Sequence, residues 1–305
     1  MSITVANAPI SYGAFELTVG IDPSTPDGIA ILDEVAASGY AGIDLGPVGY
    51  LGSGADLGQR LADRELGLAG AYLEIPYADA AGVDAMLPEL DAMLDTFDAV
   101  APYRSGPAPR PTLADAGSQA RRDNPGRAWQ DRGMGLDADA WDRFAIGLER
   151  VVARCRARGY EPTFHHETGT YIEAPWEIER MLEISDIGLC LDTGHLLISG
   201  GDPLAALQEW GARINHVHLK DATRSVMAQI IADGEPTPAI WVREAFPALG
   251  HGDAQVDAIV RHLIDADFDG WLVVEQDIMP QTPERFARAA QDQRDNRARL
   301  ASLGL

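Results

Sequence analysis

The chain has 305 residues, of which 46% are hydrophobic, and its formal net charge is −23, from 24 basic and 47 acidic side chains. This length fits one large α/β barrel or two ordinary domains, and the hydrophobic fraction is sufficient for a full core. The negative charge argues against a polyanionic partner such as DNA, although a small anionic substrate could still bind at a local positive patch.

The cysteines and the first residues suggest where the protein works. Cys155 and Cys190 lie in apolar runs and form neither a disulfide framework nor a CxxC pair, so we interpret both as buried thiols. Residues 1–7 lack the charged and then apolar pattern of a signal peptide, and no uncharged apolar stretch reaches the ~18 residues of a membrane span. We therefore expect a reduced, soluble, cytoplasmic protein with no membrane partner.

Short apolar strands alternate with amphipathic helices along the chain. The expected strands cover residues 3–11, 42–46, 68–75, 110–114 (a weak pattern), 162–167, 187–192, 214–219 and 271–275. The expected helices cover residues 25–38, 57–66, 83–100, 137–159, 175–184, 203–211, 254–266 and 283–300. Glycines mark several helix ends, and Pro26 and Pro283 suit the first helical position.

This alternation implies a parallel sheet, and no break in composition separates two domains. We predict a single (β/α)₈ TIM barrel over residues 1–305. An open doubly wound sheet is the alternative, and the lack of a glycine-rich phosphate loop after the first strand argues against it.

Residues 101–136 and 221–252 are expected to be long loops. The first could be a lid that brings cationic groups to a substrate, or simply a solvated loop. Its positive charges come from Arg104, Arg110, Arg121, Arg122, Arg127 and Arg132.

Four apolar strands each deliver a polar side chain at the carboxyl end, where parallel barrels place their active sites. Three carboxylates and one imidazole form a mostly oxygen set, which suits Mn²⁺, Mg²⁺ or Co²⁺ better than a structural zinc. Any one of these residues alone could be an ordinary polar group, but the repeated pattern predicts a divalent metal site made of Glu167, Asp192, His218 and Glu275.

Further candidates lie beside these four. His165 shares a strand face with Glu167 and is the better candidate for contact with the site than His166. Lys220 and Asp221 come just after His218; either could transfer a proton, or the two could pair as a salt bridge.

Each of three more side chains has two possible roles. His195 could reach a substrate hydroxyl or cap the next helix, and Arg224 could clamp a substrate oxygen or lie on the loop surface. His216, one layer deeper than His218, could support the site, although a core histidine is the preferred interpretation.

The proposed ligand set predicts a mechanism. A divalent ion bound to a hydroxyl and an adjacent carbonyl oxygen acidifies the C–H bond between them and stabilises an enediolate. A carboxylate, Glu167 or Glu275, could take and return the proton. Returning it to the neighbouring carbon isomerises the substrate, returning it to the opposite face epimerises it, and expelling a β-hydroxyl dehydrates it.

Several motifs resemble those of the xylose-isomerase-like TIM barrels, the sugar phosphate isomerase/epimerase superfamily. The stretch from 164 to 277 is most similar to inosose dehydratases and related cyclitol enzymes, which would place the protein in inositol catabolism. Residues 7–16 are also similar to members of this group. The motifs are Phe-His-His-Glu-Thr-Gly-Thr at 164–170, Leu-Asp-Thr-Gly-His at 191–195, Asp-Pro at 202–203, Arg-Ile-Asn-His-Val-His-Leu-Lys-Asp at 213–221, Gly-His-Gly-Asp at 250–253 and Gly-Trp-Leu-Val-Val-Glu-Gln-Asp at 270–277.

The resemblance implies a metal quartet at the four strand-end positions named above, with Mn²⁺ favoured and Mg²⁺ or Co²⁺ as alternatives. Similar ketose 3-epimerases hold their substrate with a Glu, a His and an Arg at fixed spacings from the ligands. Residues at those spacings in this chain are Glu173, His195 and Arg224.

One departure bears on the reaction. Inosose dehydratases tend to carry His-His-His-Met-Gly-Thr where this chain has His165-His-Glu-Thr-Gly-Thr170. The glutamate favours an isomerase or epimerase acting on a keto-sugar or keto-cyclitol, ahead of an inosose dehydratase-type lyase. The superfamily also contains subunits of metal-dependent C-glycoside deglycosidases, which eliminate an aglycone from a 3-keto sugar.

The family also implies possible partners. A deglycosidase subunit would need a small partner chain in a hetero-complex, and otherwise we expect a homo-oligomer. The superfamily includes endonuclease IV-like enzymes, which use a three-zinc cluster with more histidines, and the charge of −23 speaks against nucleic-acid binding here.

Overall fold

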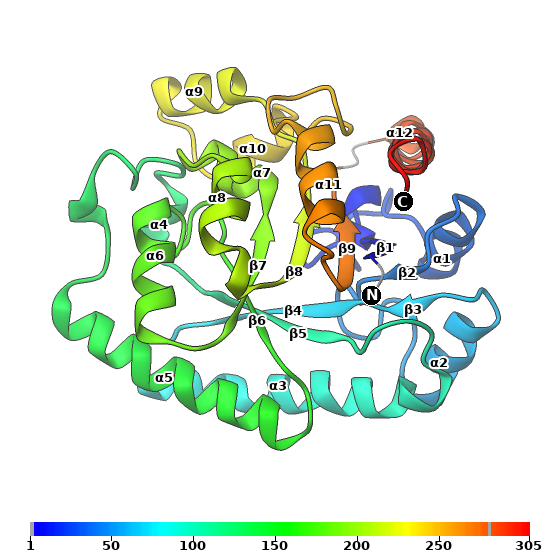
Figure 1. Cartoon of the computed structure of the whole chain (residues 1–305), viewed down its shortest axis with the longest axis horizontal. Helices are drawn as coiled ribbons and strands as arrows, with labels where there is room; N and C mark the ends of the chain where they lie inside the picture. The colour runs from blue at the N-terminus through cyan, green and yellow to red at the C-terminus, as the bar shows by residue number, and fades with distance from the viewer. Residues whose placement is uncertain (1–2, 280–281) are drawn as a thin grey trace.

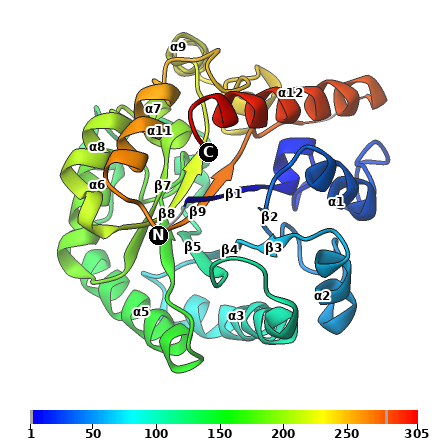
Figure 2. The same ribbon diagram turned by 45° about the vertical axis from the view of Figure 1, so that its right-hand side comes forward.

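The computed structural model describes residues 3–279 and 282–305, and within them nine parallel strand segments form one sheet in the order β3-β2-β1-β9-β8-β7-β6-β5-β4 (Figures 1 and 2). The segments are β1 Ile3–Asn7, β2 Gly42–Ile43, β3 Gly67–Leu68, β4 Gly70–Ile75, β5 Arg110–Asp115, β6 Thr163–His165, β7 Gly188–Asp192, β8 Ile214–Leu219 and β9 Gly270–Val274.

The sheet closes through one continuous stretch of chain. Only Ala69 separates β3 from β4; β3 pairs with β2, whereas β4 pairs with β5. The two segments therefore act as a single strand that joins the two ends of the sheet. The predicted TIM barrel is confirmed.

Helices surround the strands, and α3 and α5 lie side by side along one flank (Figures 1 and 2). No helix within the two described ranges is long and apolar enough to cross a membrane. The helices are α1 Gly28–Ala37, α2 Gly54–Ala62, α3 Ala80–Val100, α4 Gln119–Arg122, α5 Ala138–Ala157, α6 Pro175–Ile184, α7 Thr193–Ile198, α8 Pro203–Trp210, α9 Arg224–Asp233, α10 Pro238–Val242, α11 Val256–Asp265 and α12 Pro283–Ser302.

A buried tryptophan fills the amino end of the barrel. Trp271, at the start of β9, is 1% exposed and packs with small residues from neighbouring strands. A Cβ atom on Gly42 or Gly67 would come within 2.6 and 2.8 Å of its ring, respectively. Glycine is therefore required where β2 and β3 pass the indole, and the amino end of the barrel is a packed core.

The two segments expected as long loops carry further elements. The first contains β5 as well as α4, and the second contains α9 and α10. Met227 and Ile230 bury one face of α9, and Gly234 ends this helix in the left-handed conformation. This helix was missed although it has 10 residues, as α1, α6 and α11 do.

The first helix also begins later than predicted. The side chain of Asp27 accepts a hydrogen bond from the backbone of Ile29, so Asp27 is the N-cap and Pro26 lies before the helix.

Several arginines between β4 and α5 bind protein groups, which leaves fewer charges for the cationic lid considered above. Arg121 is 1% exposed and donates two hydrogen bonds to Glu177 of α6, at 2.8 and 3.0 Å. Arg122 and Arg127 donate to the backbone carbonyls of Ala116 and Ile231. The bidentate Arg121–Glu177 pair therefore fastens this loop to the barrel.

Removing one member of that pair should destabilise the fold. We expect Glu177→Gln to lower the free energy of unfolding by about 3 kcal/mol, because the buried Arg121 charge would lose its bidentate partner and keep only Glu173, 3.7 Å away. Urea unfolding followed by circular dichroism measures the change. The control is Asp33→Asn, which breaks an exposed ion pair with Arg64 and should cost below about 1 kcal/mol. Equal effects of the two substitutions would show that the buried pair is unimportant.

Candidate metal centre and active site

Three parallel strands bring polar side chains together at the carboxyl end of the barrel. Asp192 ends β7, His218 lies near the end of β8, and Glu275 follows β9 directly. Asp192 and His218 are direct neighbours in the β7–β8 register, and all three side chains are buried. The strand register thus produces the convergence that the sequence pattern predicted.

The two carboxylate oxygens of Asp192 have different partners. Oδ1 accepts a hydrogen bond of 2.8 Å from the backbone of His195 and caps α7. Oδ2 faces the cluster, 3.4 Å from Nε2 of His165 and 3.8 Å from Nδ1 of His218. On the far side, Nδ1 of His218 lies 3.1 Å from Oε2 of Glu275.

These contacts define a four-residue donor cluster, in which one ligand atom from each residue lies within 4.8 Å of the others. Its members are His165, Asp192, His218 and Glu275. Among the described residues, Nδ1 of His165 and both ring nitrogens of His218 make no hydrogen bond of good geometry, and Oδ2 of Asp192 has, apart from these histidines, only the ion pair with Lys220. Buried donor atoms without hydrogen bonds fit a metal ion, which would accept their lone pairs.

A lysine ammonium lies beside the donor cluster. Nζ of Lys220 is 3.0 Å from Asp192, 3.0 Å from Glu275 and 2.8 Å from Asp277. Burial acts to lower the pKa of Lys220, but the three carboxylates outweigh burial and hold this pKa well above its usual range. Lys220 therefore carries its proton and is a hydrogen-bond donor at the barrel mouth.

The neighbours of Lys220 restrict the position of its side chain. A Cβ atom on Gly194 would lie 2.6 Å from Cγ of Lys220, so the glycine makes room for the lysine. The ring of Phe246 lies 5.0 Å from the ammonium and 5.1 Å from the ring of His195. Phe246 is buried, so it covers this side of the site and is not an exposed apolar surface for a partner chain.

Asp277 joins Lys220 to His195. Its Oδ2 lies 3.5 Å from Nε2 of His195, while Nδ1 of the same ring lies 3.1 Å from the hydroxyl of Thr168. His195 is 4% exposed and lies within α7. Its ring lies beside Asp277 and its backbone takes part in the helix cap, while its contact with a substrate hydroxyl stays a prediction.

Glu167 lies beside the donor cluster, on its rim. Its Oε2 is 4.0 Å from Nδ1 of His165 and accepts a hydrogen bond from the hydroxyl of Tyr72 on β4. The same hydroxyl lies 3.0 Å from Glu74, and burial, together with the charge of Glu167, raises the pKa of Glu74 to about 7. The role of Glu167 as a metal ligand stays a prediction.

Two predicted substrate residues have other partners. Glu173 is buried; it accepts a hydrogen bond from the backbone of Gly169 and lies 3.7 Å from Arg121. Arg224 is exposed at the start of α9, and its guanidinium donates to the carbonyls of Leu197 and Gly201. The structure does not bring either residue into the cluster, and their substrate contacts stay predictions.

Asp221 holds a loop and makes no pair with Lys220. Its carboxylate accepts hydrogen bonds from the backbones of Gly250 and Gly252 at 2.7 and 2.9 Å, and from Ala254 at 3.0 Å. The interpretation of Asp221 as a proton-transfer group is therefore not supported by its contacts.

Sequence reasoning missed three polar side chains near the cluster: Asp44, Tyr72 and Asp277. Asp44 follows β2, and its Oδ2 lies 3.6 Å from Nε2 of His218. Burial raises the pKa of Asp44 to about 7. A signal was present for Asp44 and Asp277, because both follow apolar strands as the predicted ligands do. Tyr72 gave none, since a tyrosine within a strand usually belongs to the core.

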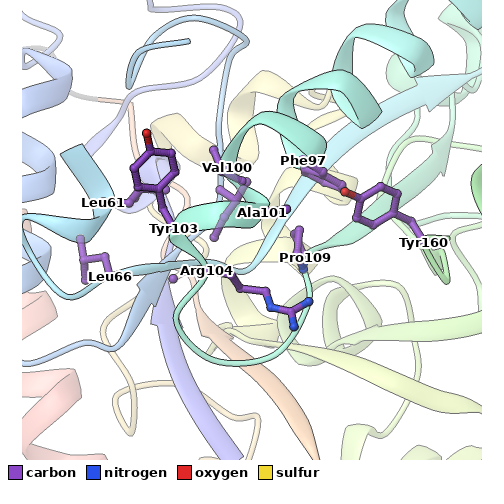
Figure 3. A pocket seen from close by; sticks show the side chains of 11 residues that line it. Leu61, Leu66, Phe97, Val100, Ala101, Tyr103, Arg104, Pro109 and Tyr160 are labelled. Atoms are coloured by element: carbon purple, nitrogen blue, oxygen red, sulfur yellow. The ribbon is translucent and has the colours of Figure 1, made fainter. Parts of the chain in front are cut away.

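The opposite end of the barrel carries a small pocket. Its lining residues come from α2, the end of α3, and the segments just before β3, β5 and β6; Figure 3 shows Phe97, Arg104 and Tyr160 among them. Because these segments precede strands, the pocket is at the amino end and has no part in the donor cluster.

Comparison with known proteins identifies the family. The model of the family described as xylose isomerase-like TIM barrel matches residues 32–297. The chain belongs to the xylose isomerase-like TIM barrel family. The resemblance seen in the sequence is thereby confirmed.

Relatives with curated names lie within this family. The inosose dehydratase of Geobacillus kaustophilus is 27% identical over 291 residues, which cover 93% of this chain and 91% of that protein. An inosose dehydratase of Bacillus thuringiensis is 34% identical over 155 residues, about half of each chain (50% and 52%).

Several solved structures share the fold. An L-ribulose 3-epimerase superposes with a TM-score of 0.68 at 16% identity, covering 99% of this chain and 94% of that chain. A protein called IOLI, solved with a zinc atom, gives a TM-score of 0.68 at 13% identity, covering 98% of each chain. With these relatives, the chain is an enzyme of the sugar isomerase, epimerase or lyase type.

The buried carboxyl group of Glu173 should make stability depend on pH. Burial, only partly offset by Arg121, raises its pKa to about 6. The folded state then holds a proton that the unfolded state releases above its ordinary pKa, so this contribution to stability is lost as pH rises through about 6.

We expect Glu173→Gln to remove about 2 kcal/mol of that decline between pH 4.5 and 7, since one pKa unit is worth about 1.4 kcal/mol. Urea unfolding at several pH values measures it. An unchanged pH profile in the variant would contradict the assignment of the buried proton to Glu173.

Proposed function

We propose that this chain is a divalent-metal-dependent enzyme that removes a proton next to the carbonyl of a keto-cyclitol or keto-sugar and eliminates a β-hydroxyl as water. The observation that carries the proposal is the buried donor cluster with the Lys220 ammonium fixed beside it. The inosose dehydratases among the relatives support the keto-cyclitol as substrate class and dehydration as the reaction.

Asp192, His218 and Glu275 would hold the metal, with His165 as the fourth donor. A bound divalent cation would supply Lewis acidity that polarises a hydroxyl and the adjacent carbonyl oxygen of the substrate. Two imidazoles beside two carboxylates suit Mn²⁺, Co²⁺ or Zn²⁺ better than Mg²⁺, which prefers oxygen ligands. We retain Mn²⁺ as the expected ion.

Glu167 is the proposed base. It borders the donor cluster, and its side chain is 20% exposed, so a substrate at the mouth can reach it. The hydroxyl of Tyr72 holds its carboxylate in place. Proton removal from carbon by a positioned carboxylate typically contributes about 10²–10⁴-fold to a rate.

Lys220 is the proposed acid. Its ammonium, held by Asp192, Glu275 and Asp277, can donate to the departing hydroxyl oxygen while the carbon–oxygen bond breaks. Glu167 follows β6 and Lys220 follows β8, so the two groups lie on either side of Asp192 on β7. One proton enters the protein at Glu167 and one leaves with the hydroxyl from Lys220, which balances the elimination of water.

Epimerisation or isomerisation is the second candidate. Glu167 and Glu275 are two carboxylates on different strands at the mouth, and an epimerase needs a base on each face of the substrate carbon. The glutamate in the 164–170 motif, where inosose dehydratases tend to carry histidine, favours this outcome.

Metal content tests the donor set. We expect about one divalent ion per wild-type chain and loss of more than about 100-fold in Mn²⁺ affinity in Glu275→Gln and His218→Ala, beyond the 10–100-fold typical of residues that only support a ligand. Elemental mass spectrometry and titration calorimetry measure both quantities.

The fourth ligand is decided by a matched pair of variants. We expect His165→Ala to lose the metal and Glu167→Gln to retain it, because His165 lies in the donor cluster and Glu167 does not. The reverse result would make Glu167 the ligand, as its sequence position suggests. A wild-type chain that binds no divalent ion would rule out the proposed mechanism.

The roles of base and acid are separated by the fate of the substrate. With Mn²⁺ and an inosose in deuterated water, wild type should exchange the C–H proton and release a product lighter by one water. Lys220→Met should still exchange but eliminate about 10²–10⁴-fold more slowly, whereas Glu167→Gln should lose both reactions. Deuterium incorporation without loss of water in wild type would instead identify an isomerase or epimerase.

A further inference from the structure

The two ring nitrogens of His218 face different carboxylates. Nδ1 points to the donor cluster, 3.1 Å from Oε2 of Glu275 and 3.8 Å from Oδ2 of Asp192. Nε2 points the other way, 3.6 Å from Oδ2 of Asp44. If the imidazole gives the lone pair of Nδ1 to an ion, the proton must be on Nε2, because a neutral imidazole carries one N–H.

Asp44 reaches His218 from across the barrel. It follows β2, and the sheet order places β1 and β9 between β2 and β8. The backbone on either side is fixed, because the Asp44 amide donates to Asn7 and the Leu45 amide donates to Gly70. The side chain is 10% exposed, and its Oδ1 has no hydrogen-bond partner in residues 3–279 and 282–305.

The space around this carboxylate is shaped for it. A Cβ atom on Gly70 would lie 3.3 Å from Oδ1 of Asp44 and 2.8 Å from the carbonyl oxygen of Arg110. Gly70 therefore leaves room for the carboxylate between β4 and the barrel interior. A buried carboxylate is costly unless something compensates it, which calls for a partner at this position.

We propose that Asp44 is a positioning residue that accepts the Nε2–H of His218 and so holds the imidazole with Nδ1 facing the metal. This inference rests on the proposed metal site. Histidines that bind metals commonly donate their second N–H to a carboxylate, which fixes the ring orientation and makes the ligand more basic. The present separation of 3.6 Å exceeds a hydrogen-bond distance, so this role requires Nε2 of His218 and Oδ2 of Asp44 to move closer when a metal binds.

A second metal ion is the competing explanation. Asp44, His216 and His218 also place donor atoms within 4.8 Å of one another, and both ring nitrogens of His216 are without a partner in the described part of the chain. Such an ion would require His218 to give up both lone pairs, one on each side. The imidazole would then have to lose its last proton, whereas donation to Asp44 needs no such step.

Three variants separate these explanations. Asp44→Leu removes the acceptor at similar size, Asp44→Asn keeps an oxygen acceptor, and Asp115→Asn is the matched control. Asp115 is the last residue of β5 and is 3% exposed, but its carboxylate accepts from the backbones of Gly117 and Tyr171. The measurements are Mn²⁺ affinity by calorimetry with chelator competition, ions per chain, and urea unfolding of the metal-free protein.

We expect Asp44→Leu to bind Mn²⁺ about 10–100-fold more weakly, Asp44→Asn to fall between it and wild type, and Asp115→Asn to match wild type. The metal-free Asp44→Leu protein should unfold no more easily than wild type, which excludes a merely structural role. Wild-type affinity in Asp44→Leu would overturn the inference and leave the proposed function standing.

Stoichiometry gives the remaining outcomes. Two ions per wild-type chain, with one lost in Asp44→Leu, would make Asp44 a ligand and overturn its role as an acceptor. A wild-type chain that binds none would overturn the proposed function and this inference together.

Discussion

The charge balance around Lys220 is the constraint on which the barrel mouth depends. Asp192, Glu275 and Asp277 are at most 7% exposed, and an uncompensated buried carboxylate costs several kcal/mol, about the stability of a small domain. The Lys220 ammonium contacts all three. Burial acts to raise the pKa of Asp192, but Lys220 and the nearby histidines hold this pKa well below its usual range. The proposed metal ligands and the proposed proton donor are therefore parts of one electrostatic unit.

Several residues near these charges also hold the backbone in place. One oxygen of Asp192 starts α7, and the other faces the donor cluster, so the start of this helix and the position of the ligand cannot change separately. Helix α7 in turn carries His195 to Asp277. Asp221, next in the chain after Lys220, anchors the 250–254 loop through backbone amides. Adjacent residues thus have different roles: Asp221 holds the backbone of a loop, whereas Lys220 faces the donor cluster.

The sequence was sufficient for the barrel and for most of the cluster. Strands with continuous apolar runs and polar carboxyl ends predicted β6 to β9 and, with them, Asp192, His218 and Glu275. Contacts between segments that are distant in the sequence could not be predicted. The burial of Arg121 against Glu177 could not be read from a run of arginines in a loop, because a charged residue is buried only when its partner arrives from elsewhere in the fold.

Asp44 and Tyr72 show the same limit within the site. Asp44 resembles the predicted ligands in pattern, yet its neighbour is a histidine from a strand that lies across the barrel, and no local spacing encodes that contact. Tyr72 lies in β4, and its hydroxyl determines where the carboxylate of Glu167 points. The position of Glu167 relative to the donor cluster is therefore set by a residue 95 positions earlier in the chain, and that contact belongs to the tertiary structure.

Glu167 and His165 compete for one place in the site, and the geometry of a strand explains why. They are two residues apart, so their side chains leave the same face of the chain at successive heights. His165 is in β6 and buried, and Nε2 of its ring lies 3.4 Å from Oδ2 of Asp192, whereas Glu167 has passed the end of the strand. A carboxylate at that height borders the donor cluster and is partly exposed at the barrel mouth, which agrees with the proposed role of Glu167 as a base. The Tyr72 hydroxyl stabilises this outward position, which leaves Glu167 available to accept a proton from carbon.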